Sequence, residues 1–423
     1  MDRGGYKWLL VALLFLVAVV NYADRTALSA VFPLLKSSLG MSDAALGAVG
    51  TTFLWSYGLA SPLAGMIGDR YRRTFLVTAS LAAWSLVTAL TGLATTSFQL
   101  LGARVLLGLS ESLYIPSALA LIGECHTKAT RGTAMSLHVA GMQLGFVVGG
   151  SLSGFLGSLY GWQAPLFVLG ATGLVLALGC HLLFQWKPIV PQLDSSPIDA
   201  SHDLPLTQAL RTTLRVPSFL ILATESMLTS VGMWVFAYWL PLYFQQTFNM
   251  TLAGAGVYGT AAVSGGGWLG ILLGGLLSDK IALRRTGHRM LLECVCYLLA
   301  APFLLSFVWS ESAGWVAMSV FFFSLFQTLG FANANPLLCD LLNPNSWSTA
   351  LGLMNLANCS MAGIGVFAAG LLKEQLGLSG AFLGVMVIQL LAAGLLLLGY
   401  TRFVDEDLKK AAAGRQHVVA VGL

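Results

Sequence analysis

Long runs of apolar residues recur along almost the whole chain and are separated by short polar stretches. Each run is long enough to cross a hydrocarbon layer of about 30 Å as a helix, which takes about 20 residues. The pattern therefore predicts an all-α membrane protein with twelve transmembrane helices. The predicted helices cover residues 8–35, 44–68, 75–95, 98–124, 132–158, 162–185, 218–246, 253–278, 290–310, 313–340, 347–372 and 379–402.

The charged residues are few, and the basic ones are concentrated in the terminal segments and in every second loop. Of the 423 residues, 57% are hydrophobic and only 9% are charged, against roughly 25% charged residues in a soluble domain. Eighteen of the 22 Lys and Arg residues lie in the terminal segments or in alternate loops, and the opposite loops hold only Lys36 and Lys373. Because basic loops stay in the cytoplasm, we expect a multi-pass inner-membrane protein with both termini cytoplasmic. The net charge of +4 follows from this bias and indicates no nucleic-acid partner.

One long polar connection, residues 185–217, divides the predicted helices six plus six. The division predicts an N-terminal half (1–186), a cytoplasmic linker (187–217), a C-terminal half (218–402) and a cytoplasmic tail (403–423). GMIGDRYRR at 65–73 is echoed by GGLLSDKIALRR at 274–285, as expected of two pseudo-symmetric halves that arose by duplication. Repeats with a binding site at their interface are the plan of secondary transporters.

Four ionisable residues lie well inside predicted helices of the first half. Asp24 and Arg25 are adjacent on the first helix, and Arg104 and Glu111 are seven residues apart on the fourth. Seven residues are close to two helical turns, so Arg104 and Glu111 face the same way about 10 Å apart. Charges at bilayer depth are costly and usually mark a substrate or ion path. The alternative is that they form two structural ion pairs, which stabilise a protein only weakly.

The motif G-x-x-x-D-R-x-x-R, formed by Gly65, Asp69, Arg70 and Arg73, resembles the signature of the major facilitator superfamily, and the resemblance covers essentially the whole chain. NYADR, RVLLGLSESLYIPS and GLMNLANCSMAG are most similar to the anion:cation symporter family of sugar-acid, sialic-acid and vesicular glutamate carriers. Spinster lysolipid carriers share a similar NY-x-DR and an Arg seven residues before a Glu, so they remain an alternative. Trp347 departs from the pattern, because the first half has Arg131 at the matching position.

The resemblance implies a role for each intramembrane charge. Glu111, with Asp24, is expected to couple protons, and Arg104, with Arg25, to bind the substrate anion. A guanidinium fork suits a carboxylate bidentately. While the two acids are ionised they can occupy the arginines, and protonation would release these to an anionic substrate. Glu225 on the seventh helix is either a third proton site or a side chain that reaches the membrane surface.

Further residues are expected to contribute to the site or to the gates. The candidate substrate-binding residues are Tyr22, Tyr57, Tyr114, Gln143, Tyr238, Asn355 and Asn358, for which packing or helix–helix hydrogen bonding is the alternative role. His138 is expected to serve packing rather than a proton relay. By resemblance, the cytoplasmic gate is formed by Gly65, Asp69, Arg70, Arg73 and Asp279.

Two rows of glycines recur every four residues, at Gly141, Gly145 and Gly149 and at Gly266, Gly270 and Gly274. Small residues at this spacing let helix backbones approach closely. The resemblance implies that these rows form the surface on which the two halves move. The alternative is tight packing within one half.

No motif in the chain indicates an enzyme or a bound cofactor. GGGWLG at 265–270 fits G-x-G-x-x-G, but it lies inside an apolar run with no strand before it. The six cysteines form no C-x-x-C pair, so neither a metal nor a redox site is predicted. We therefore expect a monomeric proton-coupled symporter of a small organic anion, with the proton as coupling ion and membrane lipid as surroundings. The alternative is a Spinster-like lysolipid carrier or a drug-type exporter.

Overall fold

The computed structural model describes residues 3–126, 128–186, 206–342 and 346–421, and these form helices without any strand. Most of the predicted linker, residues 187–205, lies outside the described residues. The chain forms two compact units. Unit 1 comprises Met1–Asp199, Trp234–Ala261 and Gly363–Leu378, and unit 2 comprises Ala200–Met233, Ala262–Ala362 and Ser379–Leu423.

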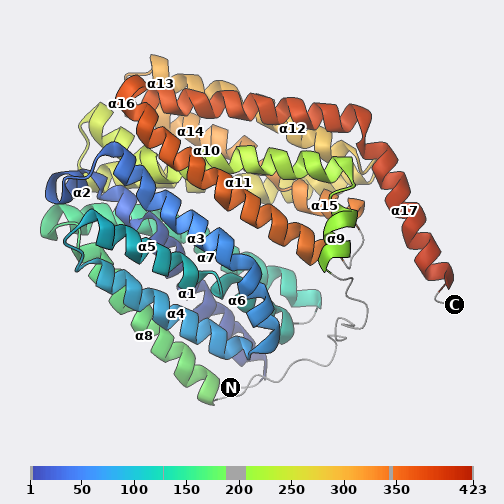
Figure 1. Cartoon of the computed structure of the whole chain (residues 1–423), viewed down its shortest axis with the longest axis horizontal. Coiled ribbons are helices and arrows are strands. Elements are labelled where there is room, and N and C mark those ends of the chain that lie inside the picture. The colour runs from blue at the N-terminus through green and yellow to red at the C-terminus, as the bar shows by residue number, and fades with distance from the viewer. Residues whose placement is uncertain (1–2, 127, 187–205, 343–345, 422–423) are drawn as a thin grey trace. The chain divides into compact units, whose positions relative to one another are not determined.

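Unit 1 is built mainly from the helices of the N-terminal half, which run side by side in Figure 1. These helices are α1 (Arg3–Ala30), α2 (Phe32–Leu39), α3 (Asp43–Arg70), α4 (Arg73–Thr91), α5 (Ser97–Glu111), α6 (Tyr114–Cys125), α7 (Lys128–Tyr160) and α8 (Ala164–Trp186). Three helices of the C-terminal half also contribute one segment each: Trp234–Phe248 of α10, Leu252–Ala261 of α11 and Gly363–Leu378 of α16. Unit 1 therefore holds contacts between the two sequence halves.

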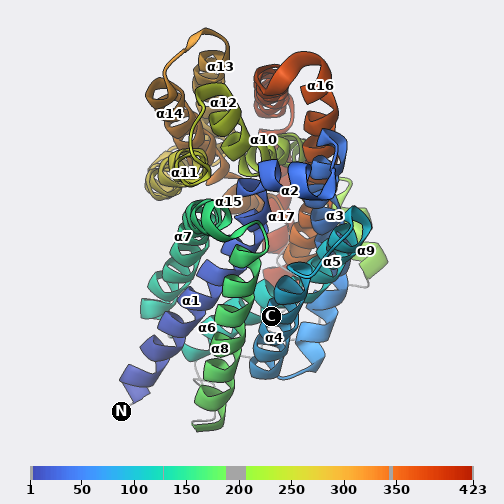
Figure 2. The same ribbon diagram turned by 90° about the vertical axis from the view of Figure 1, so that its left-hand side faces the viewer.

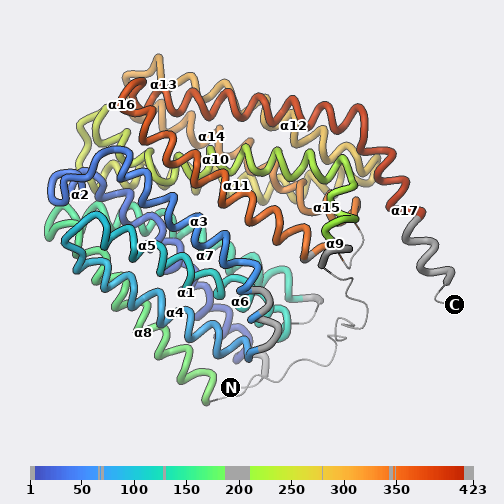
Figure 3. Tube along the Cα trace, in the orientation of Figure 1, coloured from blue at the N-terminus to red at the C-terminus, as the bar shows by residue number. Residues whose placement is uncertain are grey.

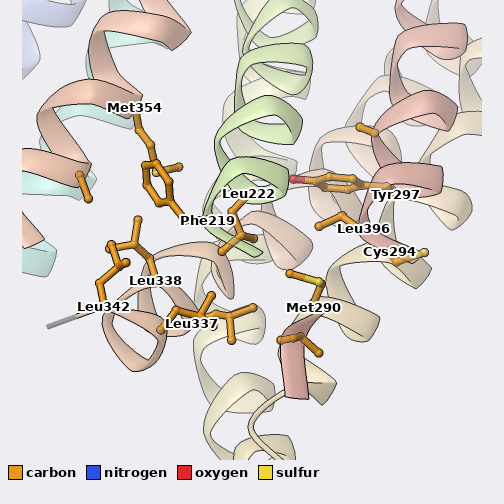
Figure 4. Packing of buried hydrophobic residues seen from close by; sticks show 14 of the residues in the cluster. Phe219, Leu222, Met290, Cys294, Tyr297, Leu337, Leu338, Leu342, Met354 and Leu396 are labelled. Carbon is orange, nitrogen blue, oxygen red and sulfur yellow. The ribbon is translucent and has the colours of Figure 1, made fainter. Parts of the chain in front are cut away.

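Unit 2 contains the remaining helices, whose order can be followed along the tube in Figure 3. They are α9 (Leu206–Thr213), α10 (Pro217–Phe248), α11 (Leu252–Ala282), α12 (His288–Ala300), a 3-10 turn (Ala301–Leu305), α13 (Ser306–Trp309), α14 (Ala313–Phe331), α15 (Ala334–Leu341), α16 (Trp347–Arg402) and α17 (Val404–Val421). An apolar core joins α10, α12, α15 and α16 through residues such as Phe219, Met290, Leu337 and Leu396 (Figure 4).

The described helices are long and apolar enough for a multi-pass membrane protein. Ten helical spans meet the length and hydropathy of a membrane crossing, the longest being Thr349–Arg402. A helix of 54 residues is about 80 Å long, more than twice the hydrocarbon thickness. Gly377 interrupts it with a φ of 68°, a conformation that only glycine adopts without strain. The prediction of separate helices over 347–372 and 379–402 places the break at the same position.

Two predicted helices are broken near their middle, beside a proline. The predicted helix over 98–124 divides into α5, ending at Glu111, and α6, whose third residue is Pro116. The predicted helix over 313–340 divides in the same way into α14 and α15, whose third residue is Pro336. Proline lacks the N–H that would bond to the carbonyl four residues earlier, and its ring clashes with that carbonyl. The break in the first half directly follows the functional candidate Glu111.

The first glycine row packs within the N-terminal half, which corrects the role expected for it. α7 and α1 lie alongside each other in Figures 1 and 2. A Cβ at Gly141 or Gly145 would lie 2.7 or 2.5 Å from the carbonyl oxygen of Phe15 or Val19 on α1. Gly149 likewise faces Ala23. The row therefore lets α7 approach α1, and it is not a surface between the halves.

The second glycine row also packs within its own half. A Cβ at Gly266, Gly270 or Gly274 would lie 2.1 to 2.5 Å from a carbonyl oxygen of α14. The close approach between the halves in unit 1 uses other glycines, because a Cβ at Gly256 of α11 would lie 2.2 Å from the carbonyl oxygen of Gly150 on α7. The spacing of four residues correctly predicted tight helix packing. The partner helices expected from the family resemblance were wrong.

Candidate functional site

The paired charges on α1 and α5 meet inside unit 1. The Arg25 Nε donates to the Glu111 Oε2 at 2.8 Å, and the two side chains are 3% and 0% exposed. Glu111 is the last residue of α5, just before the helix break, and Arg25 lies one turn before the end of α1. The pairing is therefore between the two helices, whereas the sequence spacing suggested pairs within each helix.

Aromatic rings surround the Arg25 guanidinium. Its Cζ lies 4.6 Å from the ring centre of Tyr22, 5.2 Å from that of Phe53 and 4.7 Å from that of Tyr57. Cation–π contacts are worth about 0.5–1 kcal/mol at exposed sites and more where water is excluded. Tyr22 and Tyr57 thus contact Arg25, and they hold it in place while Glu111 occupies its Nε.

Arg104 differs from Arg25 in having no hydrogen-bond partner. Its side chain is fully buried, yet Nε, Nη1 and Nη2 all lack a partner among the described residues. Its electrostatic neighbours are Tyr238, Asp24 and Glu111. A buried donor without a partner costs free energy, and a buried charge costs more. Such an arrangement is expected where the guanidinium must remain free for an anion.

Several other buried polar atoms around Arg104 and Arg25 lack protein partners. These are both amide atoms of Asn21, both carboxyl oxygens of Asp24, Arg25 Nη2, Glu111 Oε1 and the Tyr238 hydroxyl. Trp84 and Thr88 of α4 lie close to the Asp24 carboxyl, but their Nε1 and Oγ1 do not reach hydrogen-bonding geometry. The set combines donors and acceptors, so it can bind a solute that carries both an anionic group and hydroxyl groups.

Two predicted residues, Tyr114 and Gln143, have no described hydrogen bond to this group. The Tyr114 hydroxyl lies 3.1 Å from the Leu14 carbonyl oxygen, to which it can donate, and 3.0 Å from His138 Nε2. Tyr114 and His138 therefore pack together between α1, α6 and α7. Gln143 is half-buried on α7, without a hydrogen bond among those described.

The remaining substrate and proton candidates lie in unit 2. Asn358 Nδ2 donates to Ser226 Oγ at 2.8 Å, which is a contact between helices. Asn355, one turn earlier on α16, is half-buried. Glu225 is fully buried and accepts hydrogen bonds from Tyr297 and Thr229, so it points into the unit and does not extend toward its surface.

Only one of the predicted gate side chains has a described contact. Arg73 Nη1 forms an ion pair with Glu124 Oε1 at 2.8 Å and joins the start of α4 to the end of α6. The backbones of Gly65, Asp69 and Arg70 belong to α3 and that of Asp279 to α11, but their side chains lie outside the described residues.

A polar cluster at the opposite end of unit 1 was not predicted. Asp43, the first residue of α3, accepts hydrogen bonds from Lys36 of α2 at 3.0 Å and from Lys373 of α16 at 2.7 Å. Burial tends to raise the pKa of Asp43, but the two lysines outweigh it and hold the pKa below its ordinary value. A signal was present in the sequence, because Lys36 and Lys373 are the only basic residues in the loops of that side.

Two further hydrogen bonds join α16 to other helices within unit 1. Trp239 Nε1 donates to the Val366 carbonyl at 3.0 Å, and Thr51 Oγ1 donates to the Gly363 carbonyl at 2.8 Å. The latter bond connects α3 of the first half to α16 of the second. The Trp239 bond connects α10 to α16 within the second half.

The comparisons with known proteins identify the family and the fold of the chain. Residues 14–366 match the family model described as Major Facilitator Superfamily. The chain is 26% identical to the probable galactarate/D-glucarate transporter of Bacillus subtilis (strain 168), over 93% of this chain and 92% of that protein. It is also 26% identical to an MFS-type efflux pump of Mycolicibacterium smegmatis (strain ATCC 700084 / mc(2)155), over 93% and 91% of the two chains.

A similar solved structure is described as a bacterial homolog of the human lysosomal transporter Spinster, in an inward-facing and unoccupied conformation. It superposes with a TM-score of 0.83 at 19% sequence identity, covering 95% of this chain and 98% of that one. At this identity the similarity concerns the fold. The relatives include both kinds of carrier that the sequence motifs indicated.

Proposed function

This chain belongs to the Major Facilitator Superfamily, so it is a membrane transporter and not an enzyme, and we propose that it carries a small organic anion together with protons. The observation that supports this best is Arg104, a fully buried guanidinium without a hydrogen-bond partner among the described residues. Sugar acids are the favoured substrates, because the similar B. subtilis protein is described as a galactarate/D-glucarate transporter. Their carboxylate suits the guanidinium fork, and their hydroxyls suit Asn21 and Tyr238.

Coupling to protons follows from the charges inside the site. The two arginines, Arg25 and Arg104, balance the two acids, Asp24 and Glu111, when all four are ionised. Binding a monoanion adds one uncompensated negative charge in a place where an isolated charge is strongly disfavoured. Uptake of one proton by Asp24 or Glu111 restores the balance. The site therefore favours loading one proton with each negative charge of the substrate.

Glu111 is the better candidate for this proton, because protonation has a direct structural effect there. The ionised Glu111 accepts the 2.8 Å hydrogen bond from Arg25. Protonation weakens this charge-assisted bond, so Arg25 can turn toward the substrate while the rings of Tyr22 and Tyr57 still support it. Substrate and proton then stabilise the same state of the site, which is the thermodynamic condition for symport.

The test is uptake into proteoliposomes with and without an inward proton gradient. Labelled galactarate, glucarate, other small carboxylates and a lysolipid are compared in wild type, Arg104→Ala and Glu111→Gln. We expect gradient-driven carboxylate uptake that Arg104→Ala abolishes, whereas Glu111→Gln keeps exchange of anion but no longer responds to the gradient. Arg284→Ala, at an exposed arginine, is the matched control and should transport normally. A gradient response that survives in Glu111→Gln would rule Glu111 out as the coupling residue.

A second candidate function is export of a lysolipid or drug-like molecule. It is favoured by the similarity to an efflux pump and by the fold of the Spinster homolog. Gradient-driven efflux or lysolipid movement, with no carboxylate uptake in the same vesicles, would support this alternative.

We also propose twelve membrane crossings with both termini in the cytoplasm. Ten spans meet the crossing criteria, Thr349–Arg402 is long enough for two passes that meet at Gly377, and the 28-residue α3 adds another. The proposal divides the chain into halves 1–186 and 218–402, which alternate access to the site. On this topology the Asp43 cluster is on the outer side. Reporter fusions in the loops at 36–43 and 373–377 should report the outer side, and fusions at both termini the cytoplasm.

A further inference from the structure

Unit 2 contains a buried pair of carboxyl groups that the proposed transport mechanism does not use. Glu225 of α10 and Glu293 of α12 are each 0% exposed. They contact the same hydroxyl, because the Tyr297 oxygen lies 2.7 Å from Glu225 Oε1 and 3.1 Å from Glu293 Oε1. Figure 4 shows the Tyr297 hydroxyl directed toward α10 beside Leu222. Three oxygen atoms from two helices thus lie in a row.

The number of hydrogens available in this row is too small if both acids are ionised. Tyrosine has one hydroxyl hydrogen, and an ionised carboxylate has none. The single hydrogen serves one of the two oxygen–oxygen contacts, so the other would bring two oxygen lone pairs together. A hydrogen carried by one carboxyl removes the conflict, because Tyr297 then accepts from one acid and donates to the other.

Among the described residues, no cationic side chain pairs with either carboxyl and could replace this proton. Glu225 is the only ionisable residue in the unit 2 segment of α10, and α14 has none. On α12 the titratable neighbours are Tyr297, Cys294 and Cys296, while Arg289 at the start of the helix pairs with Asp340. The nearby α16 segment, residues 379–402, has its only ionisable groups at the far end, Tyr400 and Arg402.

The second oxygen atom of each carboxyl also indicates that one of the two acids is protonated. Oε2 of Glu225 and Oε2 of Glu293 are both buried without a hydrogen-bond partner among the described residues. An ionised carboxylate would leave full negative charge on such an atom, and burying an unpaired charge is strongly unfavourable. Two carboxyl groups that share one site cannot both ionise at low cost.

We propose that Glu225, Tyr297 and Glu293 form a proton-binding site in unit 2, in which one proton is shared between the two carboxyls. The ligand is a proton, and it belongs to the pair rather than to either acid. Thr229 Oγ1, which lies 3.1 Å from Glu225 Oε1, helps to orient that carboxyl. This site is separate from the Arg25–Glu111 pair of unit 1, and the proposal does not depend on what the protein transports.

The experiment is infrared spectroscopy of substrate-free protein in lipid nanodiscs at pH 7, where a protonated carboxyl gives a carbonyl band distinct from that of a carboxylate. We expect the difference between wild type and Glu293→Gln to contain one protonated-carboxyl band. Glutamine supplies the neutral hydrogen donor that the shared proton provided, so the remaining Glu225 ionises. The control Glu311→Gln, at an exposed glutamate, should leave the band unchanged. Identical spectra of wild type and Glu293→Gln in this region would overturn the proposal.

Two further measurements keep the proposal testable if Glu293→Gln folds poorly. Tyr297→Phe keeps both acids, so the proton stays but loses the bridging hydroxyl, and the band should shift without disappearing. Raising the pH should remove the band and lower the thermal stability of the wild type over the same interval, because two carboxylates then face each other. A band that does not respond to Tyr297→Phe, or a stability that does not fall as the band disappears, would contradict the shared-proton site.

Discussion

The substitution of each buried arginine by lysine tests whether the two have different functions. Arg25 is paired with Glu111 and enclosed by three rings, whereas Arg104 has no protein hydrogen bond to lose. Lysine keeps the positive charge but replaces the fork of donors with a single point charge. If Arg104 is the primary substrate ligand and the protein holds Arg25 until Glu111 takes up a proton, the two substitutions should affect different properties.

The size of each effect can be worked from these contacts. A bidentate guanidinium makes two charge-assisted hydrogen bonds to a carboxylate, each worth about 1.5–3 kcal/mol, and lysine keeps one of them. Losing the other lowers affinity about 10- to 150-fold. We expect the lysine of Arg25→Lys to keep one of the three ring contacts, and losing the other two costs about 1–4 kcal/mol of stability. We therefore expect Arg104→Lys to weaken binding with little change in melting temperature, and Arg25→Lys to lower the melting temperature by several degrees.

The assay measures both properties on the same preparation. Thermal unfolding of the purified protein in detergent gives the stability, and its shift with increasing concentrations of the transported carboxylate gives the apparent affinity. Equal affinity of Arg104→Lys and wild type, together with loss of binding in Arg25→Lys at unchanged stability, would refute the assignment. Arg25 would then be the anion-binding residue.

Two further predictions concern the packing of unit 1. Asp43→Asn should lower the melting temperature, because it leaves Lys373, 10% exposed, without its carboxylate. Since the folded pKa of Asp43 is depressed, the pair stabilises the wild type above about pH 4, and this stabilisation is lost as the pH falls through the folded pKa. The melting temperature of Asp43→Asn should therefore lack this dependence on acid pH. Gly256→Ala should impair transport and stability, because its Cβ would lie 2.2 Å from the Gly150 carbonyl oxygen. The control Gly275→Ala should be tolerated, because its Cβ meets nothing within 4 Å. Equal behaviour of the two variants in uptake and thermal unfolding would contradict the close helix contact.

Much of the helical architecture could be predicted because a membrane protein must satisfy its backbone within each span. Long apolar runs therefore indicated helices reliably, and the family resemblance is confirmed by the match over residues 14–366. The breaks after Glu111 and Phe331 were missed, although Pro116 and Pro336 were visible in the sequence. Proline breaks helices in water, but neighbouring helices can stabilise an unbroken one in a membrane, so proline alone did not decide the matter.

The sequence indicated which charged residues lie inside the helices but not which of them form ion pairs. Asp24, Arg25, Arg104 and Glu111 stood out because charges are rare inside apolar runs. Their partners depend on how α1 lies against α5, which no spacing within one helix encodes. The sequence therefore could not indicate that Arg25 would be held by Glu111 and that Arg104 would remain without a partner. Glu293 was missed because it lies near the start of an apolar run, where a charge is unremarkable.

The sequence alone was sufficient to predict a multi-pass helical membrane protein and the charges that lie inside its spans. These properties follow from local hydrophobicity, which each segment carries independently of its neighbours. Only the tertiary structure decided which buried groups are paired and which are not. That distinction depends on contacts between helices distant in the chain, such as Arg25 with Glu111, Asp43 with Lys373 and Glu225 with Tyr297. For Arg104, the lack of a hydrogen-bond partner among the described residues likewise follows from how the helices pack.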